Sequence, residues 1–285
     1  MAKMHKHQPL ISIIIPCYNS ANYIKETLLS IYHQSYQNFE IIAIDDGSND
    51  NTLEILYEEA KKESRLKVLS QENTYCVKAR IHAIQYARGD YLVCLDSDDL
   101  LGIDYLKVCV DAAEADKKLA IVYTDAFLFG ARNEPWKLPK FALPDFLLQN
   151  CIYITALIRK KDYDAVGGFD SNMTFIEDWE LFISIIKNGG KVKQIHQPLF
   201  YYRQRLDESS VSNLASDIKV SDNLLKIYNK HYDFYKENGI FLQLLTSYTL
   251  KQYELKRKKY NNPLRKYFYK WFNPRRYQKI QPYLE

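Results

Sequence analysis

The first hundred residues repeat one unit, in which an apolar run is followed by an amphipathic segment. The run at 10–19 reads LISIIIPCYN, and such a β-branched stretch without polar alternation is typical of a strand buried on both faces of a parallel sheet. Similar runs begin at Phe39, Leu66 and Tyr91. Helical patterns lie between them, and we expect the third, VKARIHAIQYARGD, to be closed by Gly89. Four strands alternating with three helices predict a doubly wound α/β sheet.

Polar side chains follow three of these strands, at the point where each strand ends. They form the clusters Pro16-Cys17-Tyr18-Asn19, Asp45-Asp46 and Asp96-Ser97-Asp98-Asp99. Because the carboxyl ends of parallel strands meet along one edge of a sheet, we expect the three clusters to converge on one crevice. Three carboxylates within four residues repel one another unless a cation lies between them. The D-x-D spacing therefore suits Mg²⁺ or Mn²⁺, which take oxygen ligands.

Each of these motifs also has an ordinary structural use. A bare D-x-D is common in turns, and the run from Asp45 to Ser48 would serve as a turn that caps a helix near Thr52. Glu177 and Asp178 open a helical pattern, where acidic residues interact favourably with the helix dipole, by about 0.3–1 kcal/mol. A general base would occupy the same place. The segment 16–19 fits an ordinary strand-to-loop turn as well, and Arg80 fits a charge on a helix surface.

Composition narrows the class of protein. The 285 residues are 47% hydrophobic, which is enough for a large core, and a net charge of +4 is too small to indicate nucleic-acid binding. Five widely spaced cysteines are expected to be reduced and structural, as in the cytosol. No window approaches the roughly 18 apolar residues of a membrane-spanning helix. We therefore expect a cytoplasmic protein.

Taken together, the motifs resemble a known family. They stand in the order SIIIPCYNSANYIKETLLSIYHQSYQNFEIIAIDDGSNDNT, then Ala79-Arg80, ARGDYLVCLDSDDLL and GGFD…EDWEL. This set is similar to the inverting nucleotide-sugar glycosyltransferases of family 2, which have the Rossmann-like GT-A fold with a mixed, mostly parallel sheet flanked by helices. The resemblance covers about residues 10–205. It implies a catalytic domain at 1–205 and a helical extension with a basic and aromatic tail at 206–285.

The resemblance also implies roles for individual residues. Asp46 would meet the imide of uracil or another base, Asp178 would be the catalytic base with Glu177 beside it, and Trp179 would shape the acceptor site. Metal ligation would fall on Asp96 and Asp98, with Asp99 as a further contact. Donor-binding roles fall on Pro16, Tyr18, Asn19, Asp45, Asp46, Arg80, Asp96, Ser97, Asp98 and Arg205.

The activity implied is transfer of a hexosyl or N-acetylhexosaminyl group, most simply from a UDP-sugar, to a hydroxyl of a glycan. Inversion needs a carboxylate that takes the acceptor proton opposite the departing diphosphate, and a divalent ion offsets the charge that grows on the diphosphate. The setting implied is bacterial surface polysaccharide synthesis, such as capsule, O-antigen or lipooligosaccharide. The alternative is a non-catalytic α/β nucleotide-binding or scaffold protein.

The chain departs from the family pattern at two positions. The family commonly has Arg-x-His after the last strand, where this chain has Arg205 in place of the histidine, so a guanidinium would face the diphosphate. The glycine usual before Ala79-Arg80 is missing.

The tail PLRKYFYKWFNPRRYQK interleaves aromatic and basic residues. This pattern suits either peripheral binding to the cytoplasmic face of the inner membrane, with a lipid-linked acceptor, or a helix packed on the domain. We expect no nucleic-acid partner.

Overall fold

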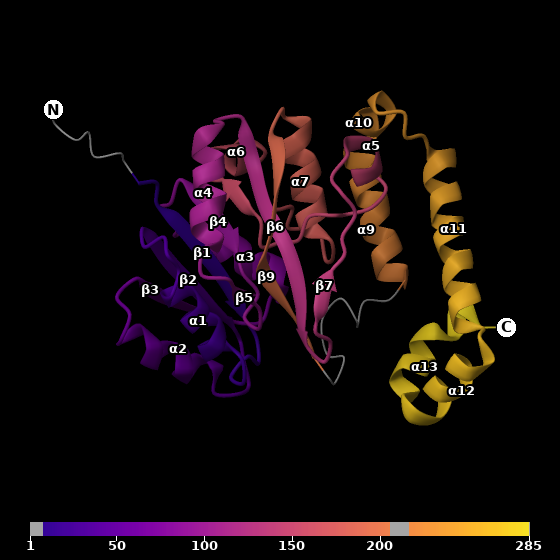
Figure 1. Cartoon of the computed structure of the whole chain (residues 1–285), viewed down its shortest axis with the longest axis horizontal. Coiled ribbons are helices and arrows are strands. Elements are labelled where there is room, and N and C mark those ends of the chain that lie inside the picture. Colours follow the sequence, from indigo (N-terminus) through magenta and orange to yellow (C-terminus); the bar gives the residue numbers. More distant parts are fainter. Residues whose placement is uncertain (1–7, 206–216, 285) are drawn as a thin grey trace.

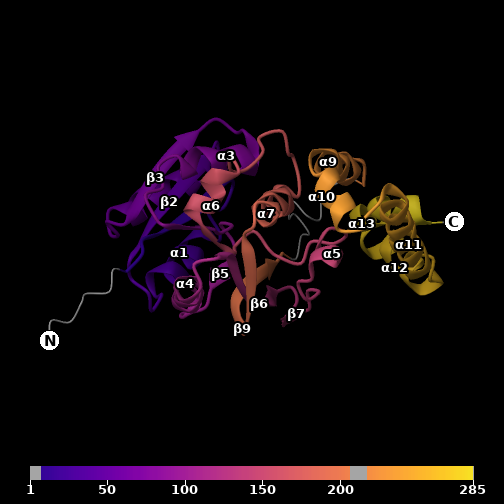
Figure 2. The same ribbon diagram turned by 90° about the horizontal axis from the view of Figure 1, so that it is seen from above.

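The computed structural model describes residues 8–205 and 217–284 and confirms the predicted α/β class. One mixed nine-stranded sheet runs through the molecule in the order β3-β2-β1-β4-β8-β6-β9-β5, with β7 paired to β6. Helices cover both faces of this sheet, as the two views in Figure 1 and Figure 2 show.

The first half is the predicted alternation of four strands and three helices. Strand β1 pairs in parallel with β2 and β4, and β2 pairs in parallel with β3. Every residue of β1 and β2 is buried, which explains why both runs lack polar alternation. The elements are β1 (Ile11–Cys17), α1 (Ile24–Tyr32), β2 (Phe39–Asp46), α2 (Thr52–Ala60), β3 (Leu66–Gln71), α3 (Tyr75–Ile84) and β4 (Tyr91–Cys94).

Two local predictions in this half were wrong. Helix α3 ends at Ile84, and Gly89 is a glycine for another reason: a Cβ atom there would lie 2.6 Å from the backbone nitrogen of Ser12. Close approach to β1 therefore requires a residue without a side chain. The first turn of α2 is satisfied by Asp50, whose Oδ1 accepts a hydrogen bond of 3.1 Å from the Thr52 amide, rather than by the run from Asp45 to Ser48.

The second half of the α/β region, residues 100–204, completes the sheet. Strand β8 is antiparallel to both β4 and β6, and so joins the two halves of the sheet. Strand β9 runs parallel to β6 from Lys191 to Gln204. The elements are β5 (Leu100–Leu101), α4 (Tyr105–Ala115), β6 (Leu119–Gly130), β7 (Glu134–Trp136), α5 (Leu143–Phe146), β8 (Leu157–Arg159), α6 (Lys160–Ala165), α7 (Glu177–Lys187) and β9 (Lys191–Gln204).

The remaining described residues are helical, as the sequence predicts. Helix α9 is held to α7 because Glu180, which is buried, accepts hydrogen bonds from His231 (2.8 Å) and Ser184 (2.8 Å) and pairs with Lys230 (2.9 Å). The predicted domain boundary after Arg205 falls next to residues 206–216, which lie outside the described part of the chain. The elements are α9 (Asp217–Lys230), α10 (Tyr232–Glu237), α11 (Leu242–Tyr260), α12 (Pro263–Phe272), α13 (Pro274–Ile280) and a 3₁₀ turn (Gln281–Tyr283).

Helices α11, α12 and α13 gather at the end of the molecule opposite β3, in both Figure 1 and Figure 2. In the ranges 8–205 and 217–284, none of the helices combines the length and the apolar character needed to cross a bilayer.

Candidate active site

Two of the three predicted polar clusters, those after β1 and β4, meet in one cavity of about 640 Å³, whereas Asp45 and Asp46 after β2 are not part of its lining. Its walls come from the loops after β1 and β4, from α3, from the first turn of α7 and from β6, β7 and β9. Among the residues predicted to act in the site, those that line it are Pro16, Tyr18, Arg80, Asp96, Ser97, Asp98, Asp99, Glu177, Asp178 and Arg205. Asp98 and Asp178, which are 80 positions apart in the chain, thus share one cavity.

Arg80 connects the two acidic motifs. Its side chain is buried on α3, with the residue 4% exposed, so it is not the surface charge that the sequence allowed as an alternative. One guanidinium nitrogen donates to Asp96 Oδ1 at 2.6 Å, and another donates to the carboxylate of Glu177. Because both partners approach one fixed planar cation, Arg80 sets the position of the loop after β4 relative to the start of α7.

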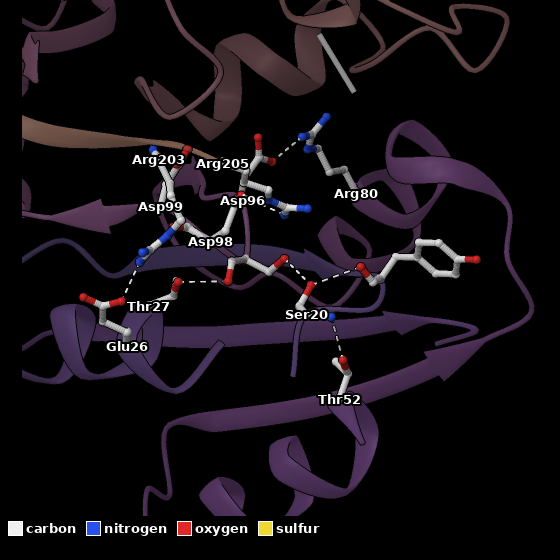
Figure 3. A network of polar contacts seen from close by, with 12 residues as sticks. Ser20, Glu26, Thr27, Thr52, Arg80, Asp96, Asp98, Asp99, Arg203 and Arg205 are labelled. Carbon is white, nitrogen blue, oxygen red and sulfur yellow. Dashed lines mark hydrogen bonds and ion pairs between the residues drawn. The ribbon is translucent and has the colours of Figure 1, made fainter. Parts of the chain in front are cut away.

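Arg203 on β9 and Arg205, which directly follows β9, hold the other two carboxylates after β4 (Figure 3). Arg205 donates to Asp98 Oδ2 at 2.8 Å through Nε and forms an ion pair with the same oxygen at 2.7 Å. The backbone amide of Arg203 donates to Asp99 Oδ1 at 2.8 Å. Burial raises the pKa of Asp98, and burial together with the charges of Asp98 and Asp96 raises the pKa of Asp99 well above its usual value.

A divalent ion fits this group in donor chemistry. Within residues 8–205 and 217–284, no cluster of three or more His, Cys, Asp or Glu side chains is arranged around a common metal position. Two observations still favour added positive charge: burial, followed by the charges of Asp98 and Asp96, raises the pKa of Asp99, and its buried Oδ2 has no hydrogen-bond partner in the described chain. Each ion pair to Arg80 or Arg205 uses one oxygen of its carboxylate. Asp96 and Asp98 are therefore the residues that would hold Mg²⁺ or Mn²⁺.

Hydrogen bonds of Ser97 with Ser20 and Thr27 fix the loop after β4. The Ser97 hydroxyl lies 2.6 Å from the Ser20 hydroxyl, and the Ser97 carbonyl accepts a bond of 3.0 Å from Thr27. Ser20 is held in turn through its amide by Thr52 at 2.7 Å (Figure 3). The hydroxyl network ties the loops after β1 and β4 to α1 and α2, so the carboxylates are presented on a rigid support.

Asp178 projects from the first turn of α7, where a general base was predicted. Its Oδ1 accepts the Trp179 amide at 2.7 Å, and Asn150 donates to Oδ2 at 3.4 Å. Burial, followed by the nearby charge of Glu177, raises the pKa of Asp178 to about 7. A carboxylate with a pKa near neutrality is suited to take a proton from an alcohol as the alcohol reacts.

Strained backbone occurs at one residue of the cavity lining, Ile176. Three non-glycine residues of the described chain have positive φ: Asn19 (50°), Tyr75 (69°) and Ile176 (54°). Ile176, a β-branched residue in the left-handed region, immediately precedes α7 and lines the cavity. This conformation turns the chain sharply into α7, so that Glu177 and Asp178 reach the site from the first turn.

Three residues predicted to bind the donor lie beside the cavity and not on it. Asn19 fastens two loops, because its Oδ1 accepts the Asn49 amide at 2.8 Å. Asp46 is buried and its Oδ1 accepts the Thr74 amide at 2.9 Å and Gln71 at 2.7 Å. Asp45 is buried as well, and its Oδ1 has no partner in the described chain. Contacts of Asp45 and Asp46 with a nucleotide base stay predictions.

Trp179, which was predicted to shape the acceptor site, is not part of the cavity lining. This residue is 4% exposed, and its indole Nε1 donates to the Phe146 carbonyl at 2.8 Å. The ring thereby anchors α7 to α5, and its effect on an acceptor stays a prediction. Its neighbours Glu177 and Asp178 do face the cavity, because successive residues on a helix point about 100° apart.

Aromatic side chains that the sequence did not single out form another part of the cavity lining. We call Trp136, Tyr153, Phe200 and Tyr202 the aromatic wall. The rings of Trp136 and Tyr202 stack with centroids 4.8 Å apart, and those of Tyr153 and Phe200 with centroids 4.3 Å apart. Trp136 on β7 and Phe200 on β9 both pair with Ala126 on β6, whose small side chain leaves room for the large rings on either side.

Comparison with known proteins agrees with this geometry. The family model described as "Glycosyl transferase family 2" matches residues 12–176, more than half of the chain. The chain belongs to glycosyl transferase family 2. The matched range contains the loops after β1, β2 and β4 together with Arg80, and it ends at Ile176, next to the base position.

The family 2 chain has relatives among much longer bacterial enzymes. It is 29% identical over 244 residues to the chondroitin synthase of Pasteurella multocida strain Pm70, covering 80% of this chain and 25% of that synthase. It spans a third or less of this synthase, of a hyaluronan synthase of Pasteurella multocida and of a chondroitin synthase of Escherichia coli.

Solved structures of similar fold include two glycosyltransferases. TarS 1-349 of S. aureus in complex with UDP-GlcNAc has a TM-score of 0.61 at 21% identity, over 82% of this chain and 76% of that one. The mannosyltransferase PcManGT of Pyrobaculum calidifontis, in complex with GDP-Man and Mn²⁺, has a TM-score of 0.61 at 19% identity, over 80% and 65%. The GT-A fold predicted from the motifs is thereby confirmed.

Proposed function

We propose that this chain is an inverting glycosyltransferase that moves a sugar from a UDP-sugar to a hydroxyl of a growing bacterial surface polysaccharide. One observation carries the proposal: a single cavity has the arginine-bound carboxylates Asp96 and Asp98 on one wall and Asp178, with its raised pKa, at the start of α7. A site for an anionic leaving group and a base for an alcohol are the two requirements of this transfer.

The proposed transfer forms one bond to the anomeric carbon and breaks another. Asp178 takes the proton of the acceptor hydroxyl as its oxygen bonds to the anomeric carbon. The bond between that carbon and the diphosphate oxygen breaks, and the electron pair leaves with the nucleoside diphosphate. A base on the face opposite the leaving group gives inversion.

Positive charge for the leaving diphosphate comes first from the chain itself. Arg205 and Arg80 line the cavity and hold Asp98 and Asp96, so a diphosphate that enters meets two fixed guanidinium groups. Mg²⁺ or Mn²⁺, held by Asp96 and Asp98 with Asp99 nearby, would add a Lewis acid that neutralises charge on the diphosphate when bound. Tyr18 and Pro16 line the adjacent part of the cavity, where we place the nucleoside.

The choice of uridine rests on two points. The carboxylate of Asp46 would accept the N3–H of uracil if its bonds to Gln71 and Thr74 rearranged. Glycosaminoglycan synthases are among the relatives, and the similar TarS structure holds UDP-GlcNAc. We propose a hexosyl or N-acetylhexosaminyl donor accordingly.

We place the acceptor against the aromatic wall. Trp136 and Tyr202 are half-buried and line the cavity, and an apolar ring face is a good surface for the C–H face of a pyranose. The acceptor is therefore a glycan, free or lipid-linked. We further propose that residues 1–205 form the catalytic domain and 206–285 an extension, and that the enzyme works in the cytoplasm, at the inner face of the membrane.

The experiment is thermal stabilisation by a panel of nucleotide sugars, followed by transfer assays with the stabilising donor. UDP-sugars should raise the melting temperature more than GDP-sugars, because a ligand stabilises the state that binds it. Release of UDP with an acceptor present then shows turnover. If the donor binds and Asp178→Asn turns over at the wild-type rate, the base assignment is wrong. If the wild type binds donor but shows no turnover with any glycan, the chain is the nucleotide-binding protein that the sequence left open.

A further inference from the structure

Helix α12 carries its apolar side chains on the face that points away from the protein. Leu264, Tyr267, Phe268, Trp271 and Phe272 recur at intervals of three and four residues, which places them in one stripe along the helix. In a helix packed on a domain such a stripe faces the core. Here the stripe faces outward, with Leu264 83%, Trp271 74% and Phe272 77% exposed.

The inner face of α12 has its own contacts, so the helix is not simply turned the wrong way. Tyr269 packs toward α11, with its ring centroid 6.3 Å from that of Tyr260. The side chain of Asn262 accepts the Arg265 amide and caps the first turn. Among the described residues, eleven of the twenty exposed large hydrophobic side chains lie between Phe241 and Phe272. Exposed apolar surface is therefore concentrated on this part of the molecule.

Charge is concentrated in the same region. Residues 241–285 contain 11 of the 39 Lys and Arg residues and two of the 35 acidic ones, so this segment carries +9 while the rest of the chain carries −5. On a helix with 3.6 residues per turn, Arg265 and Lys270 flank the apolar stripe on its two sides. The stripe thus has a basic border.

We propose that this face of α12, which we call the outer stripe (Leu264, Tyr267, Phe268, Trp271 and Phe272), inserts into the surface of an anionic phospholipid bilayer. An interfacial helix needs an apolar stripe of this width with basic residues beside it, and Trp and Tyr are the side chains that favour the level of the headgroups. The anionic lipid headgroups supply the opposite charge to the +9 segment. This proposal specifies the surface behind the membrane association above, and it holds whatever reaction the cavity performs.

Charge argues against the two other occupants of such a face. A second copy of the chain would bring two +9 segments together, and like charges facing each other oppose association. A nucleic acid would bind the basic side chains, but it would not explain why five apolar side chains are exposed in one stripe. An anionic bilayer satisfies both features at once.

The test is co-sedimentation of the whole protein with vesicles. Wild type should bind vesicles of equal parts phosphatidylcholine and phosphatidylglycerol, and it should bind pure phosphatidylcholine weakly or not at all. Added salt should release the protein from the anionic vesicles. Phe268→Ser/Trp271→Ser/Phe272→Ser should weaken binding by about 1,000-fold, since burying each large apolar side chain shifts an equilibrium by roughly tenfold. Arg265→Gln/Lys270→Gln should weaken binding by about fivefold per charge, on anionic vesicles only.

The matched control is Leu29→Ser/Tyr57→Ser, which removes two exposed apolar side chains from α1 and α2 and should bind vesicles like wild type. All variants should keep the wild-type circular dichroism spectrum and UDP-sugar binding, because the altered side chains are exposed and lie outside the cavity. Wild-type vesicle binding by the triple variant overturns the proposal. The proposal is also overturned if wild type does not bind anionic vesicles and forms a dimer that the triple variant converts to monomer. The outer stripe would then bind a second copy of the chain.

Discussion

The two walls of the cavity are built on different principles. The charged wall (Arg80, Asp96, Asp98 and Arg205) consists of ion pairs whose members come from α3, from the loop after β4 and from the end of β9, and each carboxylate is held by an arginine at 2.6–2.8 Å. The aromatic wall consists of rings on the face of paired strands, and it carries no ion pair of its own. The first wall recognises charge and its position, whereas the second offers shape and apolar surface.

The difference teaches which part of a site tolerates change. Ion pairs buried beside a cavity depend on every partner, because removal of one leaves the other uncompensated. Stacked rings can be replaced by other rings at moderate cost. A glycosyltransferase built this way would keep its donor chemistry while its acceptor wall varies. The predictions below test that contrast, beginning with the group that lies between the walls.

The largest effect is expected from Asp178→Asn. The amide has the shape of the carboxylate but cannot accept the acceptor proton, so kcat should fall by about 1,000-fold, within the range for loss of a general base. Donor affinity, measured by titration calorimetry with the UDP-sugar, should stay at the wild-type value. Asp145→Asn, an exposed carboxylate on α5, is the control and should leave kcat unchanged. A wild-type kcat in Asp178→Asn would remove the base from α7.

The pH dependence of the same group gives the next effect. Because the pKa of Asp178 is raised to about 7, its carboxylate is protonated below that pH and cannot act as a base. Plotted against pH, kcat/KM should rise through a midpoint near 7, and at pH 5 it should be about 100-fold below its plateau, since each unit is a factor of ten. A midpoint near pH 4 would show that Asp178 is not the titrating base.

Stability should respond to pH in the matching direction. The folded-state pKa of Asp178 lies above the ordinary value of about 3.9, so the folded protein holds the proton more tightly and loses stability as pH rises from about 4 to 7. Asp178→Asn removes this loss. The variant should therefore melt at a higher temperature than wild type at pH 8 and show a smaller gain at pH 4. An equal gain at both pH values contradicts the raised pKa.

Sequence reasoning reached the charged wall because its residues obey a local rule. Polar residues at the ends of buried strands mark the ligand edge of a parallel sheet, and the runs ending at Cys17 and Cys94 could be read in this way without knowledge of the rest of the chain. Their partners were less visible. That Arg80 joins Asp96 to Glu177 depends on contacts between residues 16 and 97 positions apart.

The aromatic wall could not be read in the same way. Trp136 and Phe200 come together because β7 and β9 both pair with β6 at Ala126, and register is a property of strand pairing. Tyr153 joins them from a loop, and its hydroxyl donates to the Thr124 carbonyl on β6 at 2.8 Å. In a chain with 24 tyrosines, three tryptophans and 13 phenylalanines, no single ring stands out. Nor does the sequence show that Trp179, beside Asp178 in the chain, is buried at 4% exposure.

A smaller effect, on donor binding, is expected from Arg205→Gln. Loss of the guanidinium removes a fixed positive charge from the charged wall and leaves Asp98 without its ion pair, so UDP should bind about tenfold more weakly. Arg132→Gln is the matched control, because Arg132 also lines the cavity but pairs with Glu134. Titrations with Mn²⁺ and with EDTA separate the contributions. If EDTA alone abolishes UDP binding by wild type, the ion and not Arg205 supplies the counter-charge.

The smallest effect is expected from Trp136→Ala, which alters only the aromatic wall. Truncating a tryptophan that packs on a ligand commonly costs about 1 kcal/mol, so KM for the glycan acceptor should rise about fivefold. Slow hydrolysis of the donor in the absence of acceptor, and the donor Kd, should remain at wild-type values, because the charged wall is intact. Trp136→Phe keeps a ring in contact with Tyr202 and should restore most of the acceptor affinity. A change in donor Kd with unchanged acceptor KM would reverse the assignment of the two walls, since the ring would then be part of the donor site.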